Sequence, residues 1–311
     1  MTRDEHAFAD ILQQAIGLGP LPMAVAHPCS REALLGAVEA ADHGIATPIL
    51  VAPAARLAKL ADELEVDLSR FELVDVPHSH AAAEQAVSLV RDGYADILMK
   101  GSLHTDEFMG EALARGTGIR TDRRISHVWI MKVETYPRYL FITDAAINIE
   151  PDLLTKRDIC QNAIDLTQAL GISQPKVAIL AAVETINPAM RSTLDAAALC
   201  KMADRGQITG AILDGPLAFD NAISREAADS KGIVSPVAGD PDILLVPDLE
   251  AGNMLGKQLT YLAAAASAGI VMGARAPIVL TSRADDATGR LASAAVANLL
   301  AHKRRQNGPR P

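Results

Sequence analysis

Hydroxyl, guanidinium and ammonium groups follow two apolar runs of the sequence, in an arrangement that suits an anionic ligand. Thr281-Ser282-Arg283 comes directly after one apolar run and before a helical pattern. Hydroxyl and guanidinium donors at the start of a helix suit a phosphate or an oxyanion, because the first backbone N–H groups of the helix also point at the ligand. Lys100-Gly101-Ser102 has the same character after another run. The sequence therefore predicts an anion-binding site at strand ends.

Four other apolar runs also end in polar and small residues. These are Thr143, Asp144 and Asn148 after the first, Glu184 and Asn187 after the second, Asp214, Gly215, Pro216, Asp220 and Asn221 after the third, and Asp248, Glu250 and Asn253 after the fourth. Each set on its own fits ordinary loop and helix-cap residues. Six sets at one sheet edge favour a cleft, because ligands of open α/β sheets bind beyond the carboxyl ends of the strands.

A cluster of arginines surrounds Gly116-Thr117-Gly118. Its members are Arg115, Arg120, Arg123 and Arg124, in a chain with 29 Lys and Arg, 38 Asp and Glu, and a net charge of -9. One interpretation is a solvated loop, and the other is a rim that holds a polyanionic ligand by its phosphates. The negative net charge argues against a general nucleic-acid binder, which needs a basic face to displace counterions.

Several common sites and compartments find no support in the sequence. Neither GxGxxG nor GxxxxGK[ST] follows any apolar run, and the eight histidines show no metal-ligand spacing. Three distant cysteines, Cys29, Cys160 and Cys200, resemble neither a disulfide framework nor a zinc knuckle, which favours a reducing compartment. The chain has no apolar run of membrane-spanning length and no signal-peptide pattern at its start. We expect a cytoplasmic enzyme that binds neither metal nor membrane.

The elements that position these residues follow from the apolar pattern. Short apolar runs without alternation recur at 48–52, 95–100, 128–131, 139–143, 176–180, 210–214, 242–246 and 277–281. Runs of this kind, separated by helical patterns such as 80–91 and 193–201, predict an α/β fold with a mostly parallel sheet and helices on both faces. The turn-like insert at 134–138 predicts an antiparallel hairpin over 128–143, so the sheet is mixed.

The length predicts two domains. A chain of 311 residues is about twice the usual size of one domain, and no linker divides it. We expect a first domain of residues 1–130 plus 275–311 and a second of residues 131–274, the latter contributing to the cleft and to dimerisation. The final helical pattern, 286–304, is expected to pack back on the first domain.

Several segments of the chain form a specific series in their order and spacing. They are Leu98-Met-Lys-Gly-Ser102, Ser126-His-Val128, Leu140 to Ile149, Ala181-Ala-Val-Glu184 with Asn187-Pro188, Thr193 to Ala198, Asp214-Gly-Pro-Leu-Ala218 with Asp220 to Ser224, Asp242 to Asp248 with Glu250 to Asn253, and Thr281-Ser-Arg-Ala-Asp285. Together they resemble the phosphate acetyltransferase and phosphate butyryltransferase family, most closely its butyryl-type branch. Each block alone is weak, but their order and spacing are specific.

The resemblance implies reversible acyl transfer: acyl-CoA and orthophosphate give acyl phosphate and CoA. It also implies a two-domain fold like that of isocitrate dehydrogenase, with the active site in the interdomain cleft. The resemblance further implies a homodimer, no metal and no tightly bound cofactor, with coenzyme A as a substrate. The acyl group is acetyl or another short chain such as butyryl.

By motif, the resemblance assigns catalytic roles to three residues near the end of the chain. Ser282 would hydrogen-bond the acyl oxygen or the thiolate, and Arg283 would hold phosphate and the developing charge. The acetyl-type enzymes carry their base aspartate at the position that is Gly289 here. Asp285, which is shared with the butyryl-type branch, is therefore the favoured base, and the alternatives are Asp286, Asp214, Asp220 and Asn221.

The other expected substrate-binding residues come from the strand ends already described. They are Lys100, Gly101, Ser102, Thr143, Asp144, Asn148, Glu184, Asn187, Gly215, Pro216 and Asn221. An arginine of the acetyl branch has no counterpart, because Glu111 lies about there. Contacts to the CoA phosphates therefore fall to Arg115, Arg120 or Arg124.

Two other functions stay open. A metal- and NAD-dependent decarboxylating dehydrogenase on the same fold would need paired aspartates, which Asp214 and Asp220 could supply, but the nicotinamide side has no support. A catalytically weak CoA-sensing module is favoured by the missing aspartate and opposed by the retained Ser282, Arg283 and Lys100. Activity that survives EDTA excludes the dehydrogenase. CoA release in phosphate, compared with arsenate, separates enzyme from sensor.

Overall fold

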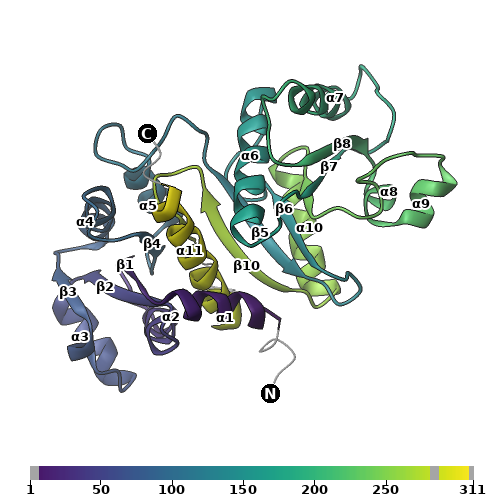
Figure 1. Ribbon diagram of the computed structural model, residues 1–311. Helices are drawn as coiled ribbons and strands as arrows, with labels where there is room; N and C mark the ends of the chain where they lie inside the picture. The colour runs from purple at the N-terminus through teal and green to yellow at the C-terminus, as the bar shows by residue number, and fades with distance from the viewer. Residues whose placement is uncertain (1–6, 281–286, 308–311) are drawn as a thin grey trace. The chain divides into compact units, whose positions relative to one another are not determined.

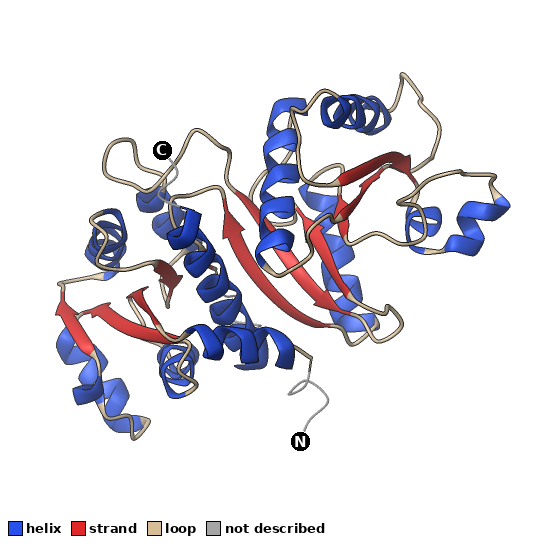
Figure 2. Ribbon diagram, in the orientation of Figure 1, coloured by secondary structure: helices blue, strands red, loops and turns tan. Residues whose placement is uncertain are grey.

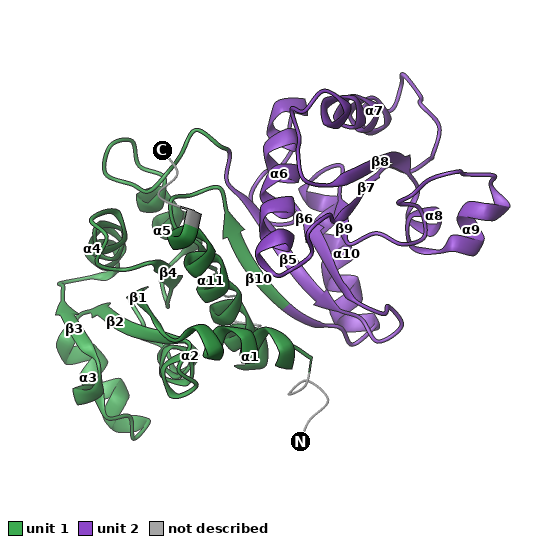
Figure 3. Cartoon of the chain, viewed as in Figure 1, with its two compact units in different colours: residues 1–123, 268–311 green, residues 124–267 purple. Residues whose placement is uncertain are grey.

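The computed structural model describes residues 7–280 and 287–307. The chain divides into two compact units, shown in Figure 3: unit 1 comprises residues 1–123 and 268–311, and unit 2 comprises residues 124–267. The unit bounds lie close to the domain bounds expected from the sequence, which were 130/131 and 274/275. The expected roles of the two domains stay predictions.

The sheet of unit 1 is parallel except for one strand. Its strands are β1 (Leu21–Ala26), β2 (Ala46–Ala52), β3 (Glu72–Asp75), β4 (Ile97–Lys100), β10 (Ala266–Met272) and β11 (Ile278–Val279). Their order is β3-β2-β1-β4-β11-β10, and only β10 runs antiparallel to its neighbour β11. The carboxyl ends of β1, β2, β4 and β11 therefore meet at one edge of this sheet.

Helices cover both faces of the sheet in unit 1. They are α1 (Ala9–Leu18), α2 (Arg31–Asp42), α3 (Ala54–Glu63), α4 (Ser79–Arg91), α5 (Thr105–Ala112) and α11 (Ala287–Asn307), with a 3-10 turn at Leu68–Arg70. Figure 1 shows α4 on one side of strands β1 and β2 and α2 on the other. The buried Asn298 of α11 donates hydrogen bonds to the carbonyls of Gly19 (2.9 Å) and Ile45 (2.8 Å). These bonds fix the final helix on unit 1, as expected.

The sheet of unit 2 begins with a hairpin and continues as a parallel sheet. Its strands are β5 (Ser126–Lys132), β6 (Tyr139–Thr143), β7 (Lys176–Leu180), β8 (Ile212–Leu217) and β9 (Ile243–Leu245), in the order β5-β6-β9-β7-β8. β5 and β6 pair antiparallel, and the other pairs are parallel. The predicted hairpin and the mixed, mostly parallel sheet are confirmed (Figure 2).

Helices also cover both faces of the sheet in unit 2. They are α6 (Leu153–Ala169), α7 (Arg191–Asp204), α8 (Phe219–Ile223), α9 (Arg225–Ser230) and α10 (Leu249–Leu262). Ser126 of β5 faces α6, since its hydroxyl accepts a hydrogen bond from Asn162 at 2.9 Å. Trp129, on the opposite face of the same strand, packs so closely on α10 that a Cβ at Gly256 would overlap its ring. Alternation along β5 thus assigns its two faces to two different helices.

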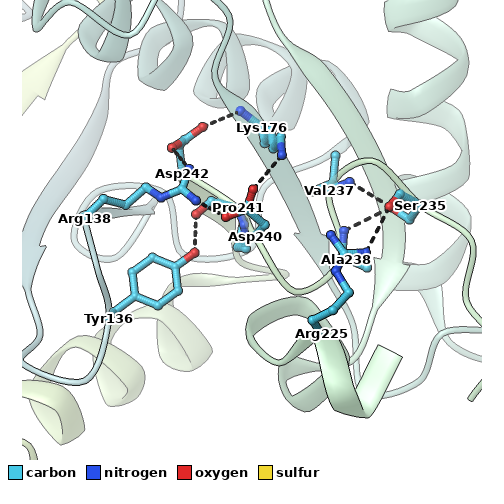
Figure 4. A network of polar contacts seen from close by, with 10 residues as sticks. All are labelled: Tyr136, Arg138, Lys176, Arg225, Ser235, Val237, Ala238, Asp240, Pro241 and Asp242. Carbon is cyan, nitrogen blue, oxygen red and sulfur yellow. Dashed lines mark hydrogen bonds and ion pairs between the residues drawn. The ribbon is translucent and has the colours of Figure 1, made fainter. Parts of the chain in front are cut away.

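An ionic network ties the hairpin turn to the amino ends of β7 and β9, as Figure 4 shows. Asp242 accepts from Arg138 (3.1 Å) and from the backbone N–H of Lys176 (2.8 Å), while the Lys176 ammonium lies 2.6 Å from Asp240. Tyr136 donates to the carbonyl of Pro241 at 2.5 Å. Burial raises the pKa of Tyr136 to about 12, so its hydroxyl keeps the proton that it donates. The network lies at the edge of the unit 2 sheet opposite the carboxyl ends of its parallel strands.

Within residues 7–280 and 287–307, every helix is too short or too polar to reach from one side of a lipid bilayer to the other.

Candidate functional site

The carboxyl ends of β1 and β4 enclose a cavity of about 270 Å³ in unit 1. It is lined by Cys29, Ser30, Glu32, Ala33, Arg56, Lys100, Gly101, Ser102, Leu103 and Arg290. Three of these, Lys100, Gly101 and Ser102, were predicted as substrate-binding residues. The sequence did not predict a place in the site for Cys29, Ser30, Arg56 or Arg290.

Main-chain bonds hold the Lys100–Ser102 segment against the end of β1. The backbone N–H of Gly101 donates to the carbonyl of Ala26 (2.9 Å), and the backbone N–H of Ser102 donates to the carbonyl of His27 (2.8 Å). A Cβ at Gly101 would overlap the carbonyl oxygens of both Ala26 and His27, so only glycine permits this approach. His27 itself has a φ of 53°, in the left-handed region that non-glycine residues seldom adopt. The floor of the cavity is therefore fixed by backbone geometry.

The hydroxyl of Ser102 also contacts His27. It donates to the carbonyl of His27 at 3.0 Å and lies 3.2 Å from the ring Nδ1 of His27. Burial, and secondarily the charge of Arg56, lowers the pKa of His27, which keeps the imidazole neutral near pH 7. Ser102 thus orients the loop, and its oxygen keeps lone pairs to accept a further bond.

The charges around the cavity favour an anion. Three cationic side chains, Arg56, Lys100 and Arg290, line the cavity together with one carboxylate, Glu32. Ser30 is the N-cap of α2 and accepts from the backbone N–H of Ala33 at 3.4 Å, which places the positive end of the helix dipole at the cavity. Arginine and lysine at a helix N-terminus form a site for phosphate or an oxyanion.

Arg290 reaches this cavity by running along α2. A Cβ at Gly36 would lie 3.5 Å from Cδ of Arg290, ordinary van der Waals contact, so the glycine leaves room for the arginine stem. The Arg290 charge also helps to lower the pKa of Glu32, behind the larger effect of backbone hydrogen bonding at that residue. Cys29 is a poor nucleophile here, because burial raises the pKa of its thiol in spite of the Arg56 charge.

The predicted catalytic residues Ser282, Arg283 and Asp285, together with the alternative Asp286, lie outside the described residues. The described chain stops at Leu280, just after β11, and resumes at Ala287, the first residue of α11. Gly289, at the position of the acetyl-type aspartate, and Arg290 are in the first turn of that helix. The assigned roles of the three residues stay predictions.

In unit 2, Asp144 organises the loop after β6. Its buried carboxylate accepts from the backbone N–H groups of His127 (3.2 Å), Ala146 (3.0 Å), Ile147 (3.2 Å) and Asn148 (3.0 Å), and from the Asn148 side chain at 2.6 Å. The arrangement gives Asp144 a structural role, with its oxygens directed into the loop.

Thr143 and Asn148, which were also predicted as substrate-binding, complete the same loop. Thr143 donates to the carbonyl of His127 at 2.9 Å, and Asn148 donates to the carbonyl of Ile125 at 2.8 Å. Arg124 lies next to Ile125, with its backbone N–H bound to Asp158 at 3.0 Å. The structure thus brings Arg124 to the same edge as Asn148 and Asp144.

A second polar group forms at the ends of β7 and β8. The side chain of the buried Asn221 donates to Glu184 at 3.2 Å, and Lys231 lies between Glu184 (3.3 Å) and Asp220 (2.9 Å). The Lys231 hydrogen bond contributes most to lowering the pKa of Asp220. Among the described residues, the side-chain oxygen of Asn221 is buried without a hydrogen-bond partner. Asn187 lies in the loop after β7, where its side-chain oxygen accepts a hydrogen bond from the backbone N–H of Ala189 at 3.0 Å.

Asp214, Gly215 and Pro216 were expected in the loop that follows Leu213, and that placement is wrong. All three lie inside β8, which runs on to Leu217. Gly215 packs against β7, where a Cβ would come within 2.7 Å of the Ile179 carbonyl oxygen. Proline is tolerated because β8 is the last strand of the order in this unit. Asp214 accepts from the Gly215 N–H at 2.9 Å.

Arg120 lies apart from Lys100, although both were predicted to bind substrate. Arg120 forms a bridge with Ala274, and the neighbouring Ile119 accepts from the N–H of Arg275 at 2.8 Å. These partners precede β11, so Arg120 is at the edge of the unit 1 sheet opposite the end of β4. In the part of the chain that the structure describes, no three His, Cys, Asp or Glu side chains gather as a metal site would require.

Comparison with known proteins agrees with the sequence motifs. The family model described as "Phosphate acetyl/butaryl transferase" matches residues 79–298. A protein named phosphate acetyltransferase from Rhizobium meliloti is 63% identical over 286 residues, 92% of this chain and 90% of the relative. A phosphate butyryltransferase from Clostridium acetobutylicum is 43% identical over 295 residues, 95% of this chain and 98% of the relative.

The fold agrees as well. The crystal structure of a branched-chain phosphotransacylase from Enterococcus faecalis V583 has a TM-score of 0.80 and 31% identity to this chain. It covers 91% of this chain, and this chain covers 99% of it. A phosphotransacetylase from Streptococcus pyogenes has a TM-score of 0.82 at 20% identity, covering 98% of this chain and 100% of that chain, which supports the fold alone.

Proposed function

Because this chain belongs to the phosphate acetyl/butyryl transferase family, it is an acyltransferase, and we propose that it moves a short acyl group reversibly between coenzyme A and orthophosphate. The family resemblance in the sequence motifs is confirmed. Relatives of this chain carry both the acetyl and the butyryl name, so the proposed acyl group is acetyl or a short chain such as butyryl.

The observation that carries the proposal is the cationic cavity at the ends of β1 and β4. Arg56, Lys100 and Arg290 surround the N-terminus of α2 there. A phosphate dianion held by these groups would lose most of its repulsion toward the anionic CoA, and the two reactants can then be held in position to react. Coenzyme A enters as a substrate, and the proposal needs no tightly bound cofactor.

The reaction exchanges one activated acyl bond for another. Toward acyl phosphate, an oxygen of orthophosphate attacks the thioester carbonyl carbon, the C–S bond breaks, and the thiolate leaves and takes up a proton. The tetrahedral intermediate carries an oxyanion, which hydroxyl and guanidinium donors stabilise. We assign these donor roles to Ser282 and Arg283. In the reverse direction, Asp285 accepts the thiol proton, with Asp214 as the alternative base.

The test is release of CoA from acyl-CoA by phosphate. We expect phosphate-dependent CoA release that survives EDTA, measured as free thiol with a panel of acyl-CoA substrates from C2 to C6. Arg283→Ala is expected to lower turnover at least about tenfold with little change in thermal unfolding, because it removes a partner of transition-state charge. Binding of acyl-CoA without turnover in phosphate or arsenate would instead identify a CoA-sensing module.

We also propose that the chain acts as a homodimer. In unit 2, an apolar groove of about 650 Å³ runs between α10 and the ends of β7 and β9. Leu262 of this groove is 81% exposed, and its neighbour Tyr261 is 73% exposed. Exposed apolar side chains on one helix mark an interaction surface, and a second copy of the chain is the proposed occupant.

We place the enzyme in the cytoplasm. Its three cysteines are free, and Cys29 and Cys160 are buried without a disulfide. Free thiols are typical of proteins from reducing compartments. Acyl-CoA and phosphate are also small, soluble substrates.

A further inference from the structure

The imidazole of His27 is a buried titratable group beside the cationic cavity. His27 directly follows β1 and is only 4% exposed. Its backbone φ of 53° is one that glycine reaches without strain and that costs free energy in a residue with a Cβ. Strain of this kind persists where a function needs it, which points to a use for the side chain. The ring contacts Ser102, which lines the cavity.

The single hydrogen of the Ser102 hydroxyl determines the direction of the bond to this ring. The hydroxyl donates to the carbonyl of His27 at 3.0 Å, and its oxygen lies 3.2 Å from the ring Nδ1 of His27. A hydroxyl has one hydrogen to donate and lone pairs with which to accept. Because the hydrogen is directed at the carbonyl, the contact with the ring is a hydrogen bond only when Nδ1 carries a proton and donates to the hydroxyl oxygen. The geometry therefore favours the tautomer with the proton on Nδ1.

The carbonyl oxygen of His27 already has other donors. It accepts from the backbone N–H of Ser102 at 2.8 Å and from the backbone N–H of Cys29 at 2.8 Å. Since a carbonyl oxygen has two lone pairs, the Ser102 hydroxyl is a third and more distant donor to it. The hydroxyl hydrogen can therefore turn to a better acceptor in the cavity, while the Nδ1–H of His27 holds the hydroxyl oxygen in place.

The surroundings of His27 keep its ring neutral. Burial contributes most to lowering the pKa of His27, and the charge of Arg56 on α3 acts in the same direction. Hydrogen bonding to Ser102 and the charge of Glu107 on α5 oppose this shift. A neutral imidazole carries one proton, so a ring that donates from Nδ1 has none on Nε2. Since the ring adds no charge to the cavity, its effect on an anion passes through the hydroxyl of Ser102.

We propose that His27 is a positioning residue, which donates from Nδ1 to Ser102 so that the Ser102 hydroxyl presents its hydrogen to an oxygen of phosphate in the cavity. Arg56, Lys100 and Arg290 line the same cavity, and their side chains are donors only. With Ser102 held as a further donor, the cavity suits the ionised oxygens of phosphate, which accept. The inference rests on the proposed function, because it takes phosphate as the ligand.

Two substitutions of His27 separate the hydrogen bond from the backbone conformation. Glycine adopts the observed φ freely but has no side chain, whereas asparagine tolerates that φ and offers an amide N–H near the place of Nδ1. We expect His27→Gly to raise the KM for phosphate about fivefold and to change kcat less, because the hydroxyl stays but loses its fixed orientation. His27→Asn should recover most of that loss. Initial rates of CoA release at varied phosphate measure both. His43→Gly, which removes an exposed imidazole at the C-cap of α2, is the matched control and should keep the wild-type KM.

A double variant shows whether His27 acts through Ser102. Ser102→Ala is expected to raise the KM for phosphate about tenfold, which is the loss of one charge-assisted hydrogen bond. Ser102→Ala/His27→Gly should be no worse than Ser102→Ala, because the ring then has no hydroxyl to orient. Multiplied effects, about fiftyfold in KM, would show that the two residues act independently and would overturn the proposal. Equal KM values in His27→Gly and His27→Asn would overturn it as well.

The tautomer of His27 can be measured on the resting protein, without turnover. Two-bond ¹H–¹⁵N correlation spectra distinguish a neutral imidazole protonated at Nδ1 from one protonated at Nε2, and the spectrum of His27→Asn identifies the His27 signals. At about pH 8, above the ordinary pKa of histidine, we expect the proton on Nδ1. We also expect inorganic phosphate to shift the His27 signals, and potassium chloride of the same ionic strength to leave them in place.

The spectra also separate this inference from the proposed acyl transfer. A ring protonated at Nε2, or signals that phosphate leaves unchanged, would overturn the positioning role of His27 even in an active enzyme. A wild-type protein that gives the expected spectra but releases no CoA in phosphate would instead contradict the acyl transfer.

Discussion

At the scale of single residues, the charge of Arg56 offers a direct test of the catalytic cavity. We expect Arg56→Gln to raise the KM for phosphate about tenfold and to change kcat less, because one charge-assisted hydrogen bond to a bound anion is worth about 1.5–3 kcal/mol. Initial rates of CoA release at varied phosphate would show it. Arg70→Gln, which removes an exposed arginine paired with Asp42, is the matched control. An unchanged KM in Arg56→Gln would remove this cavity from the phosphate site.

His127 carries a pH dependence of stability. The ring is buried on β5, its Nδ1 has no hydrogen-bond partner among the described residues, and burial lowers its pKa to about 4, with the Asp144 charge opposing the shift. The unfolded chain binds the proton more tightly, with a pKa near 6.5. Protonation therefore favours unfolding. The contribution of neutral His127 to stability is fully present above about pH 6.5 and is lost as the pH falls toward 4.

The size of this effect can be measured with urea. Between pH 7 and pH 5, His127 should account for about 2 kcal/mol of the decrease in unfolding free energy. We expect His127→Gln to be less stable at pH 7 but to lose about that much less between the two pH values. In His80→Gln, at an exposed histidine of α4, the unfolding free energy should depend on pH as it does in the wild type. If His127→Gln and the wild type lost the same unfolding free energy between pH 7 and pH 5, His127 would not be the source of the pH dependence.

At the scale of elements, the approach of β4 to β1 depends on Gly101. A methyl group there would overlap two backbone carbonyl oxygens, which cannot move without breaking the ladder between the strands. We expect Gly101→Ala to lower the unfolding free energy by about 2–4 kcal/mol, in the range of severe steric substitutions. Gly110→Ala is the control, since a Cβ there meets no atom within 4 Å in α5 and alanine favours a helix. Equal stability of the two variants would show that the strand end adapts.

The apolar pattern predicted some strands well and others not at all. β4, β6, β7 and β9 are uninterrupted apolar runs and were found. β1 was missed because Pro22 and small residues dilute its pattern, although most of the strand is buried. β3 was missed because it is an edge strand with mostly exposed side chains. β8 was placed too early because Gly215 and Pro216 together indicate a turn, whereas here they allow close packing at an edge.

The residues of the candidate site were likewise predicted only in part. Lys100–Ser102 was found because it follows a strand that the sequence reveals. Arg56 and Arg290 were not, because they come from α3 and α11 and reach the cavity only through the packing of helices around the sheet. Ser30 was missed with β1, the strand that it follows. A sequence pattern reports which residues share an element, but it does not report which elements meet.

At the scale of the whole molecule, α10 carries exposed apolar side chains beside an apolar groove. Its groove contains Leu255, Leu259 and Leu262, with Phe219 of α8 across from them. The apolar side chains that stay exposed on this helix, such as Leu262, cost free energy in a monomer, about 25 cal/mol for each Å² of apolar surface left in water. A symmetric dimer would bury the same patch of both copies, as an isologous interface requires.

The double variant Tyr261→Lys/Leu262→Lys tests this dimer. Two ammonium groups on each copy would face each other across a twofold interface, so we expect the variant to be a monomer where the wild type is a dimer, by sedimentation velocity at micromolar concentration. Val234→Lys is the control, because Val234 is fully exposed and lies outside the groove. It should leave the dimer intact. A wild-type monomer, or a double variant that still dimerises, would contradict the proposal that this helix face forms the dimer interface. Since Tyr261 and Leu262 are absent from the cationic cavity, CoA release by the monomeric variant would also show whether one copy suffices for catalysis.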